Sequence, residues 1–139
     1  QGLYSFIPAY FYGYFSGTSG GGTYRDFTIT QLQARGCSVS SNLINLPYIG
    51  IYEITLSGTV ITSGVPFAIY INVNGTAFPY SGVNNVYYSA ISGYLPVSSN
   101  GIVVTTSVNT TINFTYYAPT FNAINSGAPT FVTCKFISL

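Results

Sequence analysis

The sequence predicts an all-β fold, a jelly-roll sandwich built from short strands. Apolar and polar residues alternate with a period of two through most of the chain. Residues that favour strands are abundant, with 14 Tyr and 10 Phe among 139 residues. Turn signals of Gly, Asn or Pro recur roughly every eight to twelve residues, as in sandwiches and jelly rolls. No amphipathic window begins with a helix cap, so no helix is expected.

Pro and Gly residues divide the first part of the chain into short segments. Pro8 separates two aromatic strands, and a Gly-rich loop is expected over 17–22. The strands expected here are Leu3–Phe6, Tyr10–Phe15, Phe27–Leu32 and Cys37–Leu43.

The clearest strand is Ile51–Ile61, which begins after the turn at Gly50. Its alternation predicts one buried face and one face that is wet or interfacial. The apolar face carries Tyr52, Ile54, Leu56 and Val60, and the polar face carries Glu53, Thr55, Ser57 and Thr59.

Two Asn-Gly pairs predict tight hairpins, because a type I′ turn needs positive φ at both central residues. Asn74-Gly75 closes the strand Phe67–Val73, whose inner side is expected to carry Phe67, Ile69, Ile71 and Val73. Asn100-Gly101 is expected to separate a Tyr-rich strand from the next one. The later strands expected are Val86–Leu95, Ile102–Val108, Ile112–Tyr117 after Asn109, and Phe131–Ile137 after a loop with Pro119 and Pro129.

The length of the chain fits one domain, 1–139. The chain begins at Gln1 and contains no Met. We therefore expect a C-terminal head domain whose upstream stalk or anchor lies outside this sequence.

Charge is nearly absent, with a formal net charge of +1 and no His. The charged residues are Arg25, Arg35, Lys135, Asp26 and Glu53. They form no basic cluster, which excludes a nucleic-acid partner. No apolar run reaches the roughly 18 residues of a transmembrane helix, so membrane insertion is not expected. A surface with so little charge predicts that part of it is covered in an assembly.

Catalysis is not expected, because acid-base chemistry needs titratable groups that this chain almost lacks. Asp26 and Glu53 would have to converge to act as a glycosidase pair, and we expect solvated or ion-paired charges instead. Lys135 follows Cys134 directly, and neighbouring strand residues point to opposite faces. The sequence therefore predicts a non-enzymatic protein with no catalytic residues and no cofactor.

Metal binding is not expected either. Cys37 and Cys134 are far apart and have no His or CxxC partner. We favour separate buried thiols, and a bridge between an early strand and the last one stays open. A calcium site at Asp26 and a phosphate site in the 17–22 loop are both weak hypotheses.

Tyrosines offer a surface for binding. The series Tyr10, Tyr12, Tyr14 and the pair Tyr87-Tyr88 are suited to a subunit contact or to stacking on sugars. Ordinary packing inside the sandwich is the alternative.

Several segments, taken in order, resemble the C1q/TNF-like jelly-roll superfamily, most of all the C-terminal domains of BclA-type collagen-like spore-surface glycoproteins. They are Gly2-Leu3-Tyr4-Ser5-Phe6, Gly50-Ile51-Tyr52-Glu53-Ile54-Thr55, Ile71-Asn72-Val73-Asn74-Gly75 and the closing Phe131–Ile137. The resemblance implies a homotrimer around a threefold axis, seated on a collagen-like stalk. We expect Tyr116 and Phe131, both on late strands, at the trimer interface.

The leading hypothesis is a non-enzymatic trimeric head domain of a surface filament on a spore exosporium, which drives trimerisation and presents an outer, adhesive face. The first alternative is the head of a virion spike or fibre that binds a host cell-surface receptor. The second is a carbohydrate-binding module that binds glycans through exposed tyrosines.

Overall fold

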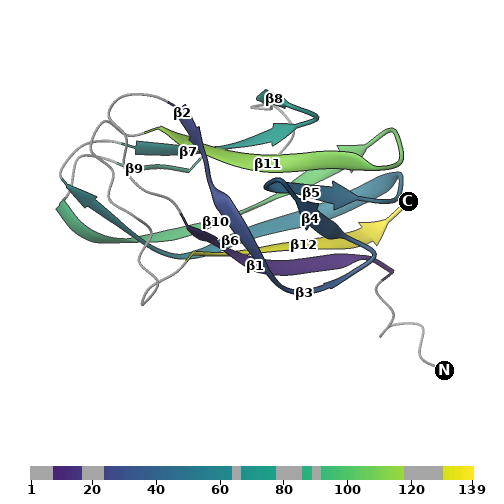
Figure 1. Ribbon diagram of the computed structural model, residues 1–139, viewed down its shortest axis with the longest axis horizontal. Helices are drawn as coiled ribbons and strands as arrows, with labels where there is room; N and C mark the ends of the chain where they lie inside the picture. The colour runs from purple at the N-terminus through teal and green to yellow at the C-terminus, as the bar shows by residue number, and fades with distance from the viewer. Residues whose placement is uncertain (1–7, 17–23, 64–66, 78–85, 89–91, 118–129) are drawn as a thin grey trace.

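The computed structural model describes residues 8–16, 24–63, 67–77, 86–88, 92–117 and 130–139 (Figure 1). Two expected loops, 17–22 and the one with Pro119 and Pro129, lie outside these residues, as does the expected strand Leu3–Phe6. The described strands are β1 (Tyr10–Ser16), β2 (Tyr24–Asp26), β3 (Thr28–Arg35), β4 (Ser38–Ser40), β5 (Leu43–Leu46), β6 (Gly50–Ser63), β7 (Phe67–Val73), β8 (Thr76–Ala77), β9 (Val86–Tyr88), β10 (Ser92–Thr105), β11 (Thr110–Tyr117) and β12 (Thr130–Ser138).

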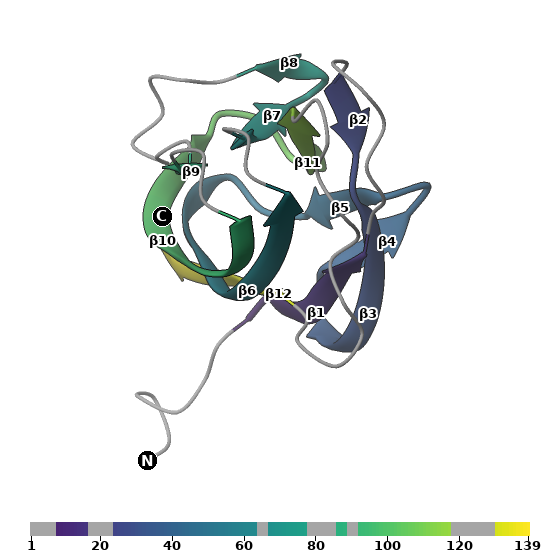
Figure 2. The same cartoon turned by 90° about the vertical axis from the view of Figure 1, so that its left-hand side faces the viewer.

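The strands form two sheets in which the neighbours are antiparallel. One sheet has five strands in the order β10-β6-β12-β1-β3. The other has seven, in the order β4-β5-β11-β7-β8, with β2 paired to β11 and β9 paired to β7. The two sheets face each other as the layers of a sandwich (Figure 2). The predicted all-β jelly-roll sandwich is confirmed. Across the described ranges, no helix has the length and apolar character needed to cross a bilayer.

The core lies between the two sheets and is built from large apolar side chains. Phe15 of β1 stacks on Phe27 with ring centroids 4.7 Å apart and meets Phe114 of β11 at 4.8 Å. All three rings are buried, so β1, β11 and the step from β2 to β3 share one aromatic cluster. Each such ring stabilises the fold by roughly 1.5–3 kcal/mol through burial alone.

The predicted inner face of β6 is confirmed where its side chains are described. Tyr52, Ile54 and Leu56 are all buried, whereas Glu53 and Thr55 between them are partly exposed. Ile71 of β7 is buried as predicted.

The turn at Asn74-Gly75 is confirmed. Asn74 has φ 50° and Gly75 has φ 80°, and the pair joins β7 to β8. Asn74 Oδ1 accepts a hydrogen bond from the Thr111 N–H at 3.0 Å, which ties the turn to the start of β11. Asn109, with φ 57°, ends the turn before β11 as its position predicted.

One other turn prediction and one strand prediction were wrong. Asn100-Gly101 is no turn, because both residues pair with Thr55 and Ile54 inside the continuous strand β10. The expected strand Cys37–Leu43 is broken by Ser41 and Asn42, which have φ of 50° and 63° and join β4 to β5 as a hairpin. Tertiary pairing with β6 overrode the Asn-Gly signal, and the hairpin at Ser41 lacks the glycine that usually marks one.

Candidate functional site

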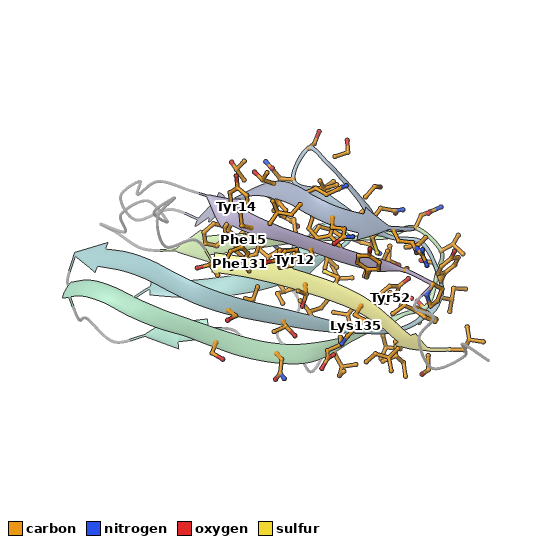
Figure 3. The ribbon with its side chains drawn as sticks, turned by 90° about the horizontal axis from the view of Figure 1, so that it is seen from below. Tyr12, Tyr14, Phe15, Tyr52, Phe131 and Lys135 are labelled. Carbon is orange, nitrogen blue, oxygen red and sulfur yellow. The ribbon has the colours of Figure 1, made fainter. Side chains whose placement is uncertain are left out.

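The surface most suited to binding is the outer face of the five-stranded sheet (Figure 3). Phe11 and Phe15 of β1 point into the core and are buried. Because strand residues alternate, Tyr10, Tyr12 and Tyr14 point outward from the same strand. These tyrosines therefore form a surface and do not fill the sandwich.

Strand register places the outward side chains of this face in rows that run across the sheet, and three of these rows extend over all five strands. Residues opposite each other on antiparallel strands lie on the same side, with Cβ atoms about 4.5–5.5 Å apart. Taken from β10 to β3, the charged row is Ile102, Glu53, Lys135, Tyr10 and Arg35; the middle row is Asn100, Thr55, Thr133, Tyr12 and Gln33; the third row is Ser98, Ser57, Phe131, Tyr14 and Thr30.

Aromatic side chains and small side chains occupy different halves of the face. Tyr12 and Phe131 stack with ring centroids 5.6 Å apart and an interplanar angle of 9°. They are diagonal neighbours on β1 and β12, close enough for aromatic rings to meet. Tyr10 and Tyr14 extend this aromatic ridge. The described outward side chains of β6 and β10 are not aromatic; they include hydroxyl and amide groups and the exposed apolar Ile102 and Val104.

The charged row holds three of the five charged residues of the chain. Lys135 Nζ lies 3.4 Å from Glu53 Oε1, and the two side chains are 49% and 34% exposed. Among the side chains that the structure describes this is the one ion pair, and Arg35 has no carboxylate within ion-pair distance. Within the described part of the chain, the cation at the β3 edge is therefore without a carboxylate partner.

A hydroxyl network fixes the end of β6 that lies beside the charged row. Tyr52 Oη accepts a hydrogen bond from the Tyr48 N–H at 2.9 Å and donates to the Tyr48 carbonyl at 3.1 Å. Thr105 Oγ1 accepts from the Gly50 N–H at 2.9 Å and donates to the Tyr48 carbonyl at 2.9 Å. These bonds position β6 against β10 and thereby set the register of the face.

The two cysteines supply no reactive group. Both are free and buried, in keeping with the favoured hypothesis of separate thiols. Burial raises the pKa of the Cys37 thiol from 9.0 to about 12, and it raises that of Cys134 well above the ordinary value. A thiol held in its neutral form is neither a nucleophile nor a metal ligand near neutral pH.

A second apolar surface lies at the end of the sandwich that carries the C-terminus (Figure 1). It is an open pocket of about 350 Å³ whose walls are almost wholly apolar. Such a pocket lacks the few placed polar groups that orient a small ligand. Its lining residues are Pro8, Tyr48, Ile49, Val108, Phe136 and Leu139.

The residues singled out from sequence do not all meet. Phe131 lies on the outer face of the five-stranded sheet, but Tyr116 lies on β11 of the seven-stranded sheet. Asp26 and Glu53 also belong to different sheets, on β2 and β6.

Sequence reasoning missed the cross-strand pairing of Glu53 with Lys135. A signal was present, because both charges fall at outward positions of predicted strands. The order of strands in the sheet was needed to place β6 beside β12, and alternation alone does not supply it.

Comparisons with known proteins identify the fold. No protein-family model matches the chain, and no curated protein matches it. Structures of murine APRIL at pH 5.0 and at pH 8.0 are similar, with TM-scores of 0.70 and 0.68, identities of 10% and 9%, and coverage of 92% of this chain and 98% of theirs. The PRD1 vertex protein P5 has a TM-score of 0.59 at 12% identity, covering 96% of this chain and 99% of its own. The chain has a TNF-like jelly-roll fold.

Proposed function

We propose that the chain is a non-enzymatic head domain that assembles as a homotrimer. One observation carries the proposal, the aromatic ridge that the five-stranded sheet turns outward. Tyr12, 36% exposed, stacks on Phe131 on a face that the core does not use. Aromatic residues are enriched at the buried centres of protein interfaces.

The fold supports a threefold assembly in particular. The sequence resemblance to the C1q/TNF-like superfamily implies a homotrimer, and the similarity to murine APRIL supports the same jelly roll. A chain with only 4% charged residues gains solubility when identical neighbours cover such a face. Phe131 is proposed to lie in this contact, and Tyr116 stays a proposed interface residue on the second sheet.

The finer proposal is that the trimer heads a collagen-like surface filament on a spore. A head of this kind would hold three chains together and so lower the entropy cost of forming a triple helix. The test is to fuse Gly-Pro-Pro triplets upstream of the domain and to follow triple-helix melting by circular dichroism. We expect a higher melting temperature than for the free peptide, and Tyr12→Glu should abolish the increase. An unchanged melting temperature would contradict the role.

A second candidate, the head of a virion spike that binds a host receptor, is favoured by the similarity to the PRD1 vertex protein P5. The filament role and the virion role differ in the kind of segment that would precede the domain. Gly-X-Y repeats upstream support the filament, and a capsid-anchoring segment supports the virion.

The third candidate is glycan binding through Tyr10, Tyr12 and Tyr14. These rings cannot be buried between subunits and also stack on sugars. A glycan array probed with the assembled protein separates the roles, because binding that Tyr12→Ala removes would favour the carbohydrate-binding module.

A further inference from the structure

The charged row divides the outer face into two electrically different ends. Arg35 stands at the β3 edge, and Glu53 stands on β6 near the β10 edge. Tyr10 and Lys135 lie between them in the same row. The face therefore presents a cation at one end and a carboxylate toward the other.

Symmetry decides which ends meet. A cyclic trimer uses a heterologous contact, in which one patch of a subunit meets a different patch of the next. Rotation about the threefold axis does not change the position of a residue along that axis, so a given residue lies at the same level in all three copies. With an axis that runs along the strands, the charged row of one copy is level with the charged row of its neighbour.

Resting on the proposed homotrimer, we propose that the Arg35 guanidinium of one copy pairs with the Glu53 carboxylate of the next. The partner is a second copy of this chain, and the contact is head to tail. Charge complementarity supports it, because Arg35 has no carboxylate partner among the described side chains. Burying an unpaired cation in an interface would oppose assembly.

The Glu53 carboxylate can accept hydrogen bonds from Lys135 of its own chain and from Arg35 of the neighbouring copy at the same time. An ionised carboxylate offers about four lone-pair sites, and Lys135 Nζ lies 3.4 Å from one of its oxygens, Oε1. The guanidinium presents donors in a planar fork that matches a carboxylate. Lys135 then acts as a positioning residue that holds Glu53 toward the neighbouring copy.

A charge exchange within the chain tests this contact. The double variant E53K/K135E keeps the in-chain ion pair and the net charge, but it places a cation opposite Arg35 of the next copy. We expect its trimer to dissociate at a protein concentration at least about tenfold higher than the wild type, in buffer of low ionic strength. Adding R35E to the double variant should return the midpoint to within about threefold of the wild type.

The readouts are light scattering over a dilution series and urea unfolding to confirm that each variant folds. R35Q is a second test in case the charge exchange disturbs the strands, and it is also expected to weaken the trimer. The control is S38A, an exposed position on β4 of the seven-stranded sheet. A wild-type trimer with an unaffected double variant, or with an unaffected R35Q, overturns the Arg35–Glu53 contact alone. A wild type that stays monomeric overturns the proposed trimer and this contact with it.

Discussion

Single hydroxyl groups hold the register on which the outer face depends. Thr105 is buried and is the side-chain acceptor for the Gly50 N–H at 2.9 Å. A buried donor without a partner costs more than the hydrogen bond itself contributes, because its hydration is lost as well.

Thr105→Val should therefore lower the free energy of unfolding by about 1–3 kcal/mol. Urea unfolding at one fixed protein concentration measures the change. Thr106→Val is the matched control, since Thr106 is exposed and its loss should stay within about 0.5 kcal/mol. Equal effects of the two changes would contradict the role of the network.

The buried thiols predict a loss of stability in alkali. Burial raises the pKa of Cys37 from 9.0 to about 12, so the unfolded chain releases this proton before the folded chain does. The contribution is complete below pH 9.0 and is lost as the pH rises toward 12, at up to about 1.4 kcal/mol per pH unit for one thiol.

Cys37→Ala should flatten this dependence, while Cys134 and Tyr52, whose pKa values burial also raises, keep part of the slope. The measurement is the urea midpoint at several pH values from 7 to about 10.5, the accessible part of the window. Parallel curves for the variant and the wild type would count against this cause.

At the scale of elements, glycines act through two different constraints. Gly75 has φ 80° and open space around it, so glycine is favoured there for its backbone conformation and not for lack of room. Gly13 lies in β1 beside the bulge where β3 carries the additional residue Leu32. A Cβ at Gly13 would lie 2.3 Å from the Thr30 carbonyl oxygen, so its requirement is space between strands.

We expect Gly13→Ala to be the more damaging change. Gly75→Ala should cost about 1–2 kcal/mol, the usual penalty of the left-handed region. Gly13→Ala must displace a neighbouring backbone and should cost more than about 3 kcal/mol or shift the pairing of β1 with β3. Thermal unfolding of both variants ranks them, and the reverse order would argue against the close approach.

Alternation and turn chemistry predicted most elements because they are local properties. Asn74-Gly75 formed its hairpin, and the Asn74 N–H donates to the Thr111 carbonyl at 2.8 Å, which leaves the turn intact. Asn100-Gly101 did not, because β6 offers partners along the whole of β10. The fold class followed from periodicity, whereas the break at Ser41 depended on a hairpin without glycine.

The outer face was harder to predict than the fold. In β1 both sets of alternating residues are aromatic, so periodicity cannot say whether tyrosines or phenylalanines face the core. In β6 the charge of Glu53 identifies the outer side at once. To predict the rows across the sheet, one must know the order of the strands. That order places β6, from the middle of the chain, beside β12, from its end.

For the whole molecule, the account places the main assembly contact on the five-stranded sheet, with Tyr116 as a proposed interface residue on the other sheet. Tyr12→Glu and Leu43→Glu introduce the same charge at residues of nearly equal exposure, 36% and 37%. Tyr12 lies on β1 of the five-stranded sheet, and Leu43 lies on β5 of the other. Tyr12→Glu should weaken the trimer by roughly tenfold or more in midpoint concentration, and Leu43→Glu should leave it unchanged. Equal effects in light scattering would remove the distinction between the sheets.

The most direct test of the central claim is the mass of the wild-type chain in solution, measured by size-exclusion chromatography with light scattering. One copy has a mass of 14.9 kDa. The account predicts a single species of three copies, about 45 kDa, that persists on dilution through the micromolar range. A stable monomer of 14.9 kDa across that range would contradict it.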